Sequence, residues 1–136
     1  FRGPYISSLL ECRTRRNLDT PGRKQAQAIG ASIQKSGIRF DQILSSEWCR
    51  CKETVKLLGI GQWQTFSGLN SFFQNYADKT TTLRELEFKL KNKDGGMMFL
   101  VTHLVVIRAA AGASVASSEL VAFNSVSQQK KIFRLD

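Results

Sequence analysis

The 136-residue sequence contains a single histidine, His103, and only two prolines. Its apolar runs, such as "MMFLV", are too short to cross a bilayer, so no transmembrane segment is expected. It has no internal repeats or low-complexity tracts, and no composition shift marks a domain boundary. With 42% hydrophobic and 23% charged residues, the chain is predicted to fold as one globular domain over residues 1–136.

Cysteine is scarce as well. The sequence has three cysteines, Cys12, Cys49 and Cys51, and an odd number argues against a framework in which every cysteine is paired in a disulfide. With His103 they could just supply four zinc ligands. However, Cys-x-Cys spacing points its two sulfurs to different faces of a helix, and structural zinc sites usually carry Cys-x-x-Cys. We therefore expect no metal and no cofactor. We interpret the three residues as free cysteines that pack as small hydrophobic side chains. Unpaired cysteines slightly favour a cytoplasmic location for the protein.

Acidic residues are few relative to basic ones, and the formal net charge is +9. This excess favours anionic partners, which include phosphate esters, nucleic acids and acidic surfaces. The segment over 13–24 is crowded with basic residues: Arg13, Arg15, Arg16, Arg23 and Lys24. No aromatic stacking platform of the kind that single-strand binders use is interleaved with them, so a nucleic-acid partner is ranked last.

Helix and strand signals alternate along the chain. A threonine followed by proline predicts a helix start at Thr20, and glycines predict helix ends at Gly37 and Gly112. We expect helices over 20–36, 47–58, 82–92 and 104–111, strands over 40–45, 97–103, 118–126 and 130–136, and a loop with one short strand over 59–79. This alternation predicts an α/β fold, a three-layer sandwich whose mainly parallel sheet is closed by a hairpin or edge strands.

Two unusual polar residues follow predicted strands. "ILSS" leads into the helix whose first turn carries Arg50, and "LVTH" places His103 at the end of another strand. Ligands bind beyond the carboxyl ends of such strands, and a helix N-terminus, a guanidinium and an imidazole together suit a phosphate group. The alternatives stay open at this point: Arg50 could be a solvated surface charge, and a lone histidine is more often a hydrogen-bonded structural residue.

Three motifs carry a resemblance to a known family. The order "RNLDTPGRKQAQAIG", "ILSSEWCRCKET", "FLVTHLVVIRAAAG" resembles the histidine phosphatase superfamily, with its phosphoglycerate mutase-like fold, over roughly Glu11 to Glu119. "ECRTRRNLD" looks like a stretch found in a bacterial branch of that family. The resemblance implies that Arg50 holds the phosphoryl group and that His103 is the second active-site histidine. It also implies that Arg16 and Ser46 contribute to substrate binding.

The family's signature, an Arg-His pair at the end of the first strand whose histidine becomes phosphorylated, is missing from the sequence. If "YISSLLECRTR" is the first strand, Glu11 and Cys12 stand in the place of that pair, but too few residues precede "RNLDTPG". We favour the alignment that puts the first strand and its histidine upstream of Phe1. The domain is then N-terminally incomplete, and an upstream piece or a rearranged sheet using "PYISSLL" must supply a central strand. A signal peptide removed upstream would favour the periplasm.

The resemblance implies a phosphatase that hydrolyses a phosphomonoester, on a small molecule or a phosphoprotein, through a phosphohistidine and without a metal. Whether the chain is an enzyme then depends on the upstream histidine. The alternative is a catalytically inactive relative that binds phosphate or a protein partner. No general acid is assigned: Asp78, Glu85 and Glu87 are available, but both glutamates are expected to be helix-surface charges. Substrate identity and oligomeric state are left open.

Overall fold

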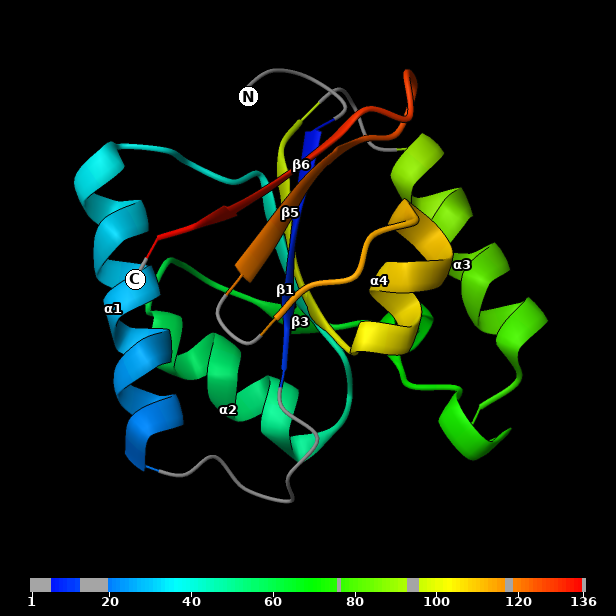
Figure 1. The fold of residues 1–136 in the computed structure, drawn as a ribbon, viewed down its shortest axis with the longest axis horizontal. Helices are drawn as coiled ribbons and strands as arrows, with labels where there is room; N and C mark the ends of the chain where they lie inside the picture. Colours follow the sequence, from blue (N-terminus) through cyan, green and yellow to red (C-terminus); the bar gives the residue numbers. More distant parts are fainter. Residues whose placement is uncertain (1–5, 13–19, 76, 93–95, 117–118, 136) are drawn as a thin grey trace.

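The computed structural model describes residues 6–12, 20–75, 77–92, 96–116 and 119–135 (Figure 1). These residues form six strands and four α-helices, which alternate over most of the chain. In chain order they are β1 (Ile6–Glu11), α1 (Thr20–Ser36), β2 (Gln42–Ser45), α2 (Cys49–Leu58), β3 (Gln64–Thr65), α3 (Lys79–Lys91), β4 (Met98–Thr102), α4 (Leu104–Ala111), β5 (Glu119–Asn124) and β6 (Lys130–Arg134). Two short 3₁₀ turns, Ser67–Leu69 and Phe73–Asn75, lie between β3 and α3.

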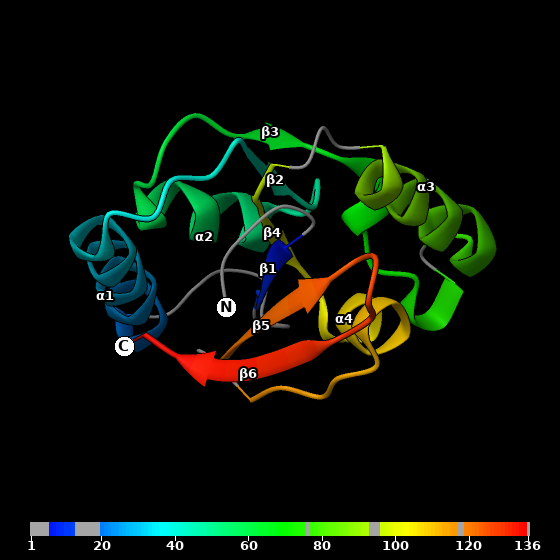
Figure 2. The same cartoon turned by 90° about the horizontal axis from the view of Figure 1, so that it is seen from above.

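One sheet organises the molecule, with the strand order β3-β2-β4-β1-β5-β6 (Figure 2). β1, β2, β3 and β4 run parallel, whereas β5 pairs antiparallel with β1 and β6 pairs antiparallel with β5. Helices α1 and α2 cover one face of the sheet, and α3 and α4 cover the other (Figure 1). The predicted α/β class, the mainly parallel sheet and the closing pair of strands are confirmed.

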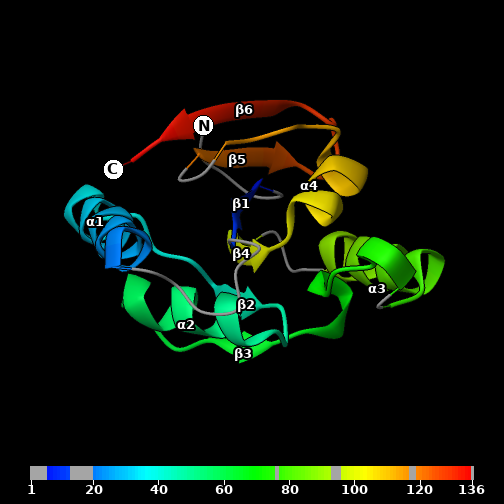
Figure 3. The same ribbon diagram turned by 60° about the horizontal axis from the view of Figure 1, so that its bottom comes forward.

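The central strand is β1, which lies between β4 and β5 (Figure 3). Leu9 is paired with Leu100 on one side and with Val121 on the other. The central strand is thus supplied by "ISSLL", as in the expected alternative that uses "PYISSLL", and the apolar residues Leu9 and Leu10 are buried between the two helical layers. The end of β1 therefore brings Glu11 and Cys12 to the carboxyl edge of the sheet, beside the end of β4.

The helices begin and end close to the predicted residues. In α1 the three-and-four spacing of Ala26, Ile29 and Ile33 produces its buried face. Helix α3 begins at Lys79, three residues earlier than expected, because the Asp78 carboxylate accepts the Thr81 N–H at 2.9 Å and caps its N-terminus. Two hydrophobic cores result, one on each face of the sheet. Within the described residues, no helix combines the length and the hydrophobicity needed to span a bilayer.

Candidate active site

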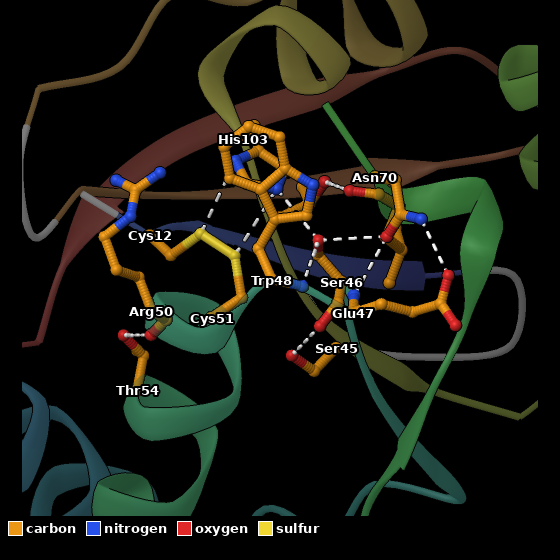
Figure 4. Close-up of a disulfide and its surroundings, with 12 residues drawn as sticks. Cys12, Ser45, Ser46, Glu47, Trp48, Arg50, Cys51, Thr54, Asn70 and His103 are labelled. Atoms are coloured by element: carbon orange, nitrogen blue, oxygen red, sulfur yellow. Dashed lines mark hydrogen bonds between the residues drawn. A yellow bond between two sulfur atoms is a disulfide. The ribbon is translucent and has the colours of Figure 1, made fainter. Parts of the chain in front are cut away.

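The site lies at the carboxyl end of the sheet, where three neighbouring parallel strands end. Ser46 follows β2, His103 follows β4 and Cys12 follows β1. The backbone continues the sheet at this edge, since the Ser46 N–H donates to the Val101 carbonyl at 2.9 Å and the Cys12 N–H donates to the Thr102 carbonyl at 2.7 Å. Parallel strands deliver their last residues to one edge, so these three side chains converge there (Figure 4).

Arg50 lies in the first turn of α2 and is only 5% exposed. Its guanidinium carbon lies 5.6 Å from the centroid of the Trp48 ring, and its Nη1 atom has no hydrogen-bond partner among the described residues. Burial lowers the pKa of Arg50, although the carboxylate of Glu11 opposes this shift. Arg50 is therefore a buried cation, and the alternative of a solvated surface charge is excluded.

His103 is 6% exposed, immediately before the first turn of α4. Its ring lies edge-on to Trp48, with the two centroids 4.7 Å apart. Burial, together with the positive charge of Arg50, lowers the pKa of His103 to about 4. The imidazole is therefore neutral at pH 7.

A hydrogen-bond chain fixes which nitrogen of His103 carries the proton. Asn70 is oriented by Glu47, whose N–H donates to Asn70 Oδ1 at 2.9 Å and whose carboxylate accepts from Asn70 Nδ2 at 2.8 Å. The single Ser46 hydroxyl proton is donated to Asn70 Oδ1 at 3.1 Å. Ser46 Oγ must then accept from His103 Nε2, which lies 2.8 Å away. His103 Nδ1, which then carries the lone pair, lies 3.8 Å from Cys12 Sγ, and Cys51 Sγ lies 3.7 Å from Nε2.

Cys12 and Cys51 form a disulfide across a sequence separation of 39 residues, whereas Cys49 is free and exposed. The expectation of three free cysteines is wrong for this pair, because the fold brings the end of β1 against the first turn of α2. The slight preference for a cytoplasmic location was argued from unpaired cysteines, so this disulfide removes the argument for it. The two sulfurs of the Cys-x-Cys segment do point to different environments, since Cys51 is buried and Cys49 is not.

The remaining sequence candidates lie elsewhere. Arg16, predicted near the pocket mouth, lies outside the described residues. Asp78 caps α3, and the Glu87 carboxylate accepts from Lys91 Nζ at 2.8 Å on the exposed side of the same helix. Glu85 accepts from the Ser67 hydroxyl. Among the described residues, the contacts of these three acidic side chains lie at α3 and not at Arg50 or His103, so they give no reason to assign a general acid.

Sequence reasoning missed Asn70, Glu47 and Trp48 as parts of the site. Asn70 comes from the aperiodic segment between β3 and α3, and its place depends on how that segment folds back over the end of β2. Trp48 lies two residues after the Ser-Ser motif, and its backbone N–H donates to Ser46 Oγ at 3.3 Å. An aromatic residue so close to the Ser-Ser motif was the one feature of the sequence that could have indicated Trp48 as part of the site.

Three cavities of the described structure lie away from Arg50 and His103. A cavity of about 640 Å³ runs along residues 41–44 and 61–64 at the β3 edge of the sheet. One of about 280 Å³ lies between α3, α4 and β5, and one of about 220 Å³ lies between the end of α1 and the sheet. Arg50 and His103 themselves are only 5% and 6% exposed.

The comparisons with known proteins agree with this architecture. The family model of the histidine phosphatase superfamily (branch 1) matches residues 8–89, which is more than half of the chain and begins within β1. No protein with a curated description matches the sequence.

Solved structures of similar fold cover almost the whole chain. The protein histidine phosphatase SixA complexed with tungstate superposes with a TM-score of 0.70 at 11% identity, covering 94% of each chain. A phosphoserine phosphatase mutant from Entamoeba histolytica in complex with phosphoserine gives 0.67 at 13% identity, covering 93% of this chain and 94% of that one. Phosphoglycerate mutase from Plasmodium falciparum gives 0.65 at 15% identity, covering 95% of this chain and 88% of that one. With the sequence match and the phosphoglycerate mutase-like fold in agreement, the chain belongs to branch 1 of the histidine phosphatase superfamily.

Proposed function

We propose that the protein is a phosphatase that hydrolyses a phosphomonoester at the site formed by Arg50, Ser46 and His103. The observation that carries the proposal is the buried guanidinium of Arg50, whose Nη1 lacks a hydrogen-bond acceptor among the described residues. A buried cationic donor without an acceptor is costly, and phosphoryl oxygens are strong acceptors for arginine. The N-terminus of α2, where Arg50 lies, also favours an anion.

The names of the structural relatives support a phosphate-containing ligand. One relative was solved with phosphoserine, and another with tungstate, a tetrahedral oxyanion that resembles phosphate in shape and charge. The net charge of +9 adds a general attraction for anions. The proposed substrate is therefore a phosphorylated small molecule or a phosphoprotein.

The proposed chemistry has two steps and uses no metal. A histidine attacks phosphorus and the alcohol leaves with a proton from a general acid; water then hydrolyses the phosphohistidine. Arg50 would neutralise charge on the phosphoryl oxygens, with Ser46 and His103 as neighbouring hydrogen-bonding groups and Arg16 at the mouth. His103 is the only histidine of the sequence and resembles the second one of the family, so this route requires a nucleophilic histidine that the given residues do not supply.

A second candidate is a catalytically inactive member that binds phosphate or a protein partner. The observations that favour it are that the given sequence has no Arg-His pair and that Cys12, directly after β1, is bonded to Cys51. Such a site keeps the phosphate-holding arginine and has no nucleophile.

Hydrolysis of a generic aryl phosphate by the protein purified from its natural source separates the two candidates. A phosphatase hydrolyses it, and Arg50→Ala lowers kcat/KM by roughly 100- to 1000-fold because charge on the transferring group is no longer neutralised. The matched control Lys56→Ala removes an exposed charge from the same helix and should retain activity.

If hydrolysis is absent while inorganic phosphate raises the melting temperature of wild type and Lys56→Ala, but not of Arg50→Ala, the inactive phosphate-binding member is correct. If inorganic phosphate is neither released nor bound, the phosphatase and the phosphate-binding member are both ruled out.

A further inference from the structure

We propose that Cys12, Cys51 and His103 form a binding site for Zn²⁺ or a similar thiophilic divalent cation once the Cys12–Cys51 disulfide is reduced. The three residues are buried, and their possible ligand atoms all lie within 4.8 Å of one another. They come from the end of β1, the first turn of α2 and the end of β4, so the fold alone brings them together (Figure 4).

The distances fit a single tetrahedral ion. Zinc lies about 2.3 Å from a thiolate sulfur and about 2.0 Å from an imidazole nitrogen, which separates the two ligand atoms by roughly 3.5 Å. Cys12 Sγ and His103 Nδ1 are already 3.8 Å apart, whereas Cys51 Sγ lies 3.7 Å from Nε2 and would have to move towards the Nδ1 side of the ring. The two sulfurs, which are bonded to each other in the disulfide, would have to separate to roughly 3.8 Å. Disulfide and bound metal therefore exclude each other.

The histidine is already prepared as a ligand. Its Nε2–H is held by Ser46 Oγ at 2.8 Å, and Ser46 is held in turn by Asn70, which leaves the lone pair at Nδ1 on the side of Cys12. A metal-binding histidine almost always donates its other N–H to such a partner, which fixes the tautomer and the ring orientation.

The donor set also indicates which ion is bound and how. Two thiolates and one imidazole are ligands that zinc prefers, and three protein ligands leave the fourth position for water or an anion. In the reduction step, a dithiol reductant is oxidised to its own disulfide and the Cys12–Cys51 bond gives two thiols. Zinc then displaces the two thiol protons into solvent, and the two thiolate charges balance the ion.

The inference stands independently of the proposed phosphatase function. It also revises the argument from the sequence, which disfavoured zinc because Cys49 and Cys51 point to different faces of one helix. That geometry holds, but the second sulfur is supplied by Cys12 from β1 instead of by Cys49.

Cobalt titration of the natural protein tests the site, because cobalt bound by thiolates absorbs through sulfur-to-metal charge transfer. We expect the fully reduced protein to bind one equivalent with this absorption, and the disulfide form to show none. Cys12→Ser and Cys51→Ser should each remove the absorption, whereas Cys49→Ser, the matched control at the free and exposed cysteine, should keep it. Absorption that persists in Cys12→Ser or is lost in Cys49→Ser overturns the proposal.

A second measurement needs only the wild type, so it holds even if the variants fail to fold. The reduced protein is treated with iodoacetamide with and without Zn²⁺, and the modified cysteines are identified by mass spectrometry. Zinc should slow modification of Cys12 and Cys51 at least tenfold and leave Cys49 unchanged. Equal rates with and without zinc at Cys12 and Cys51 would show that no such site exists.

Discussion

At the residue scale, His103 combines two effects that both disfavour its charged form. Burial is the larger one, and the positive charge of Arg50 adds to it, so its pKa falls from the ordinary 6.5 to about 4. The unfolded chain lacks both effects and binds a proton at pH values where the folded protein does not. Between these two pKa values the unfolded state therefore carries more protons, and stability increases with pH.

We predict that the free energy of unfolding decreases as the pH falls from about 6.5 to about 4, with the loss at His103 on the order of 3 kcal/mol. Urea denaturation at pH 7, 5.5 and 4 measures it. In His103→Gln the decrease over this window should be smaller by that amount, because the sequence has no other histidine. Identical pH profiles for wild type and His103→Gln would contradict the prediction.

At the scale of the elements, the position of α2 depends on a close approach to α1. Gly30 of α1 is buried, and a Cβ atom built on it would lie 1.9 Å from the carbonyl oxygen of Leu58. That neighbour is backbone at the end of α2, which cannot rotate away as a side chain could. The helices can approach this closely only because residue 30 has no side chain, and α2 in turn carries Arg50 and Cys51.

Gly30→Ala is accordingly predicted to destabilise the protein by about 2 to 3 kcal/mol, although alanine is intrinsically the better helix former. The exposed substitution Gln27→Ala in the same helix should change stability by less than about 0.5 kcal/mol. Chemical denaturation of both variants checks the contrast. A Gly30→Ala protein as stable as wild type would mean that the two helices do not approach as described.

At the scale of the whole molecule, the disulfide links the central strand to a helix that covers one face of the sheet. The bridge joins Cys12 after β1 to Cys51 in α2 and encloses α1 and β2. A cross-link over 39 residues restricts the unfolded chain strongly.

We expect reduction of this bond to lower the free energy of unfolding by about 3 to 4 kcal/mol in the absence of added metal. Thermal denaturation with and without a dithiol reductant in the presence of a chelator measures the loss. Cys12→Ser should resemble the reduced protein, while Cys49→Ser should resemble the oxidised wild type. If Cys12→Ser melts at the wild-type temperature, the bridge contributes nothing to stability.

The elements whose boundaries depend on local chemistry were predicted from the sequence. Helix α4 ends at Gly112, which adopts a φ of 66° that glycine tolerates best, and α1 begins at the expected threonine. Strand β4 was identified because a continuous apolar run suits a strand covered on both faces. The place of β1 was foreseen only as an alternative, because a strand's position in a sheet depends on its partners, and these are residues about 90 to 120 positions away.

The sequence by itself determined the α/β class, the family and the placement of Arg50 and His103 after strands, because periodicity, caps and motif order are local properties of the chain. Only the tertiary structure decided that Arg50 is buried and that His103 is neutral, since burial depends on which elements pack over a residue. It also decided that Cys12 meets Cys51 instead of remaining free. Contacts of this kind join residues that lie far apart in sequence, and they cannot be predicted from the local sequence pattern.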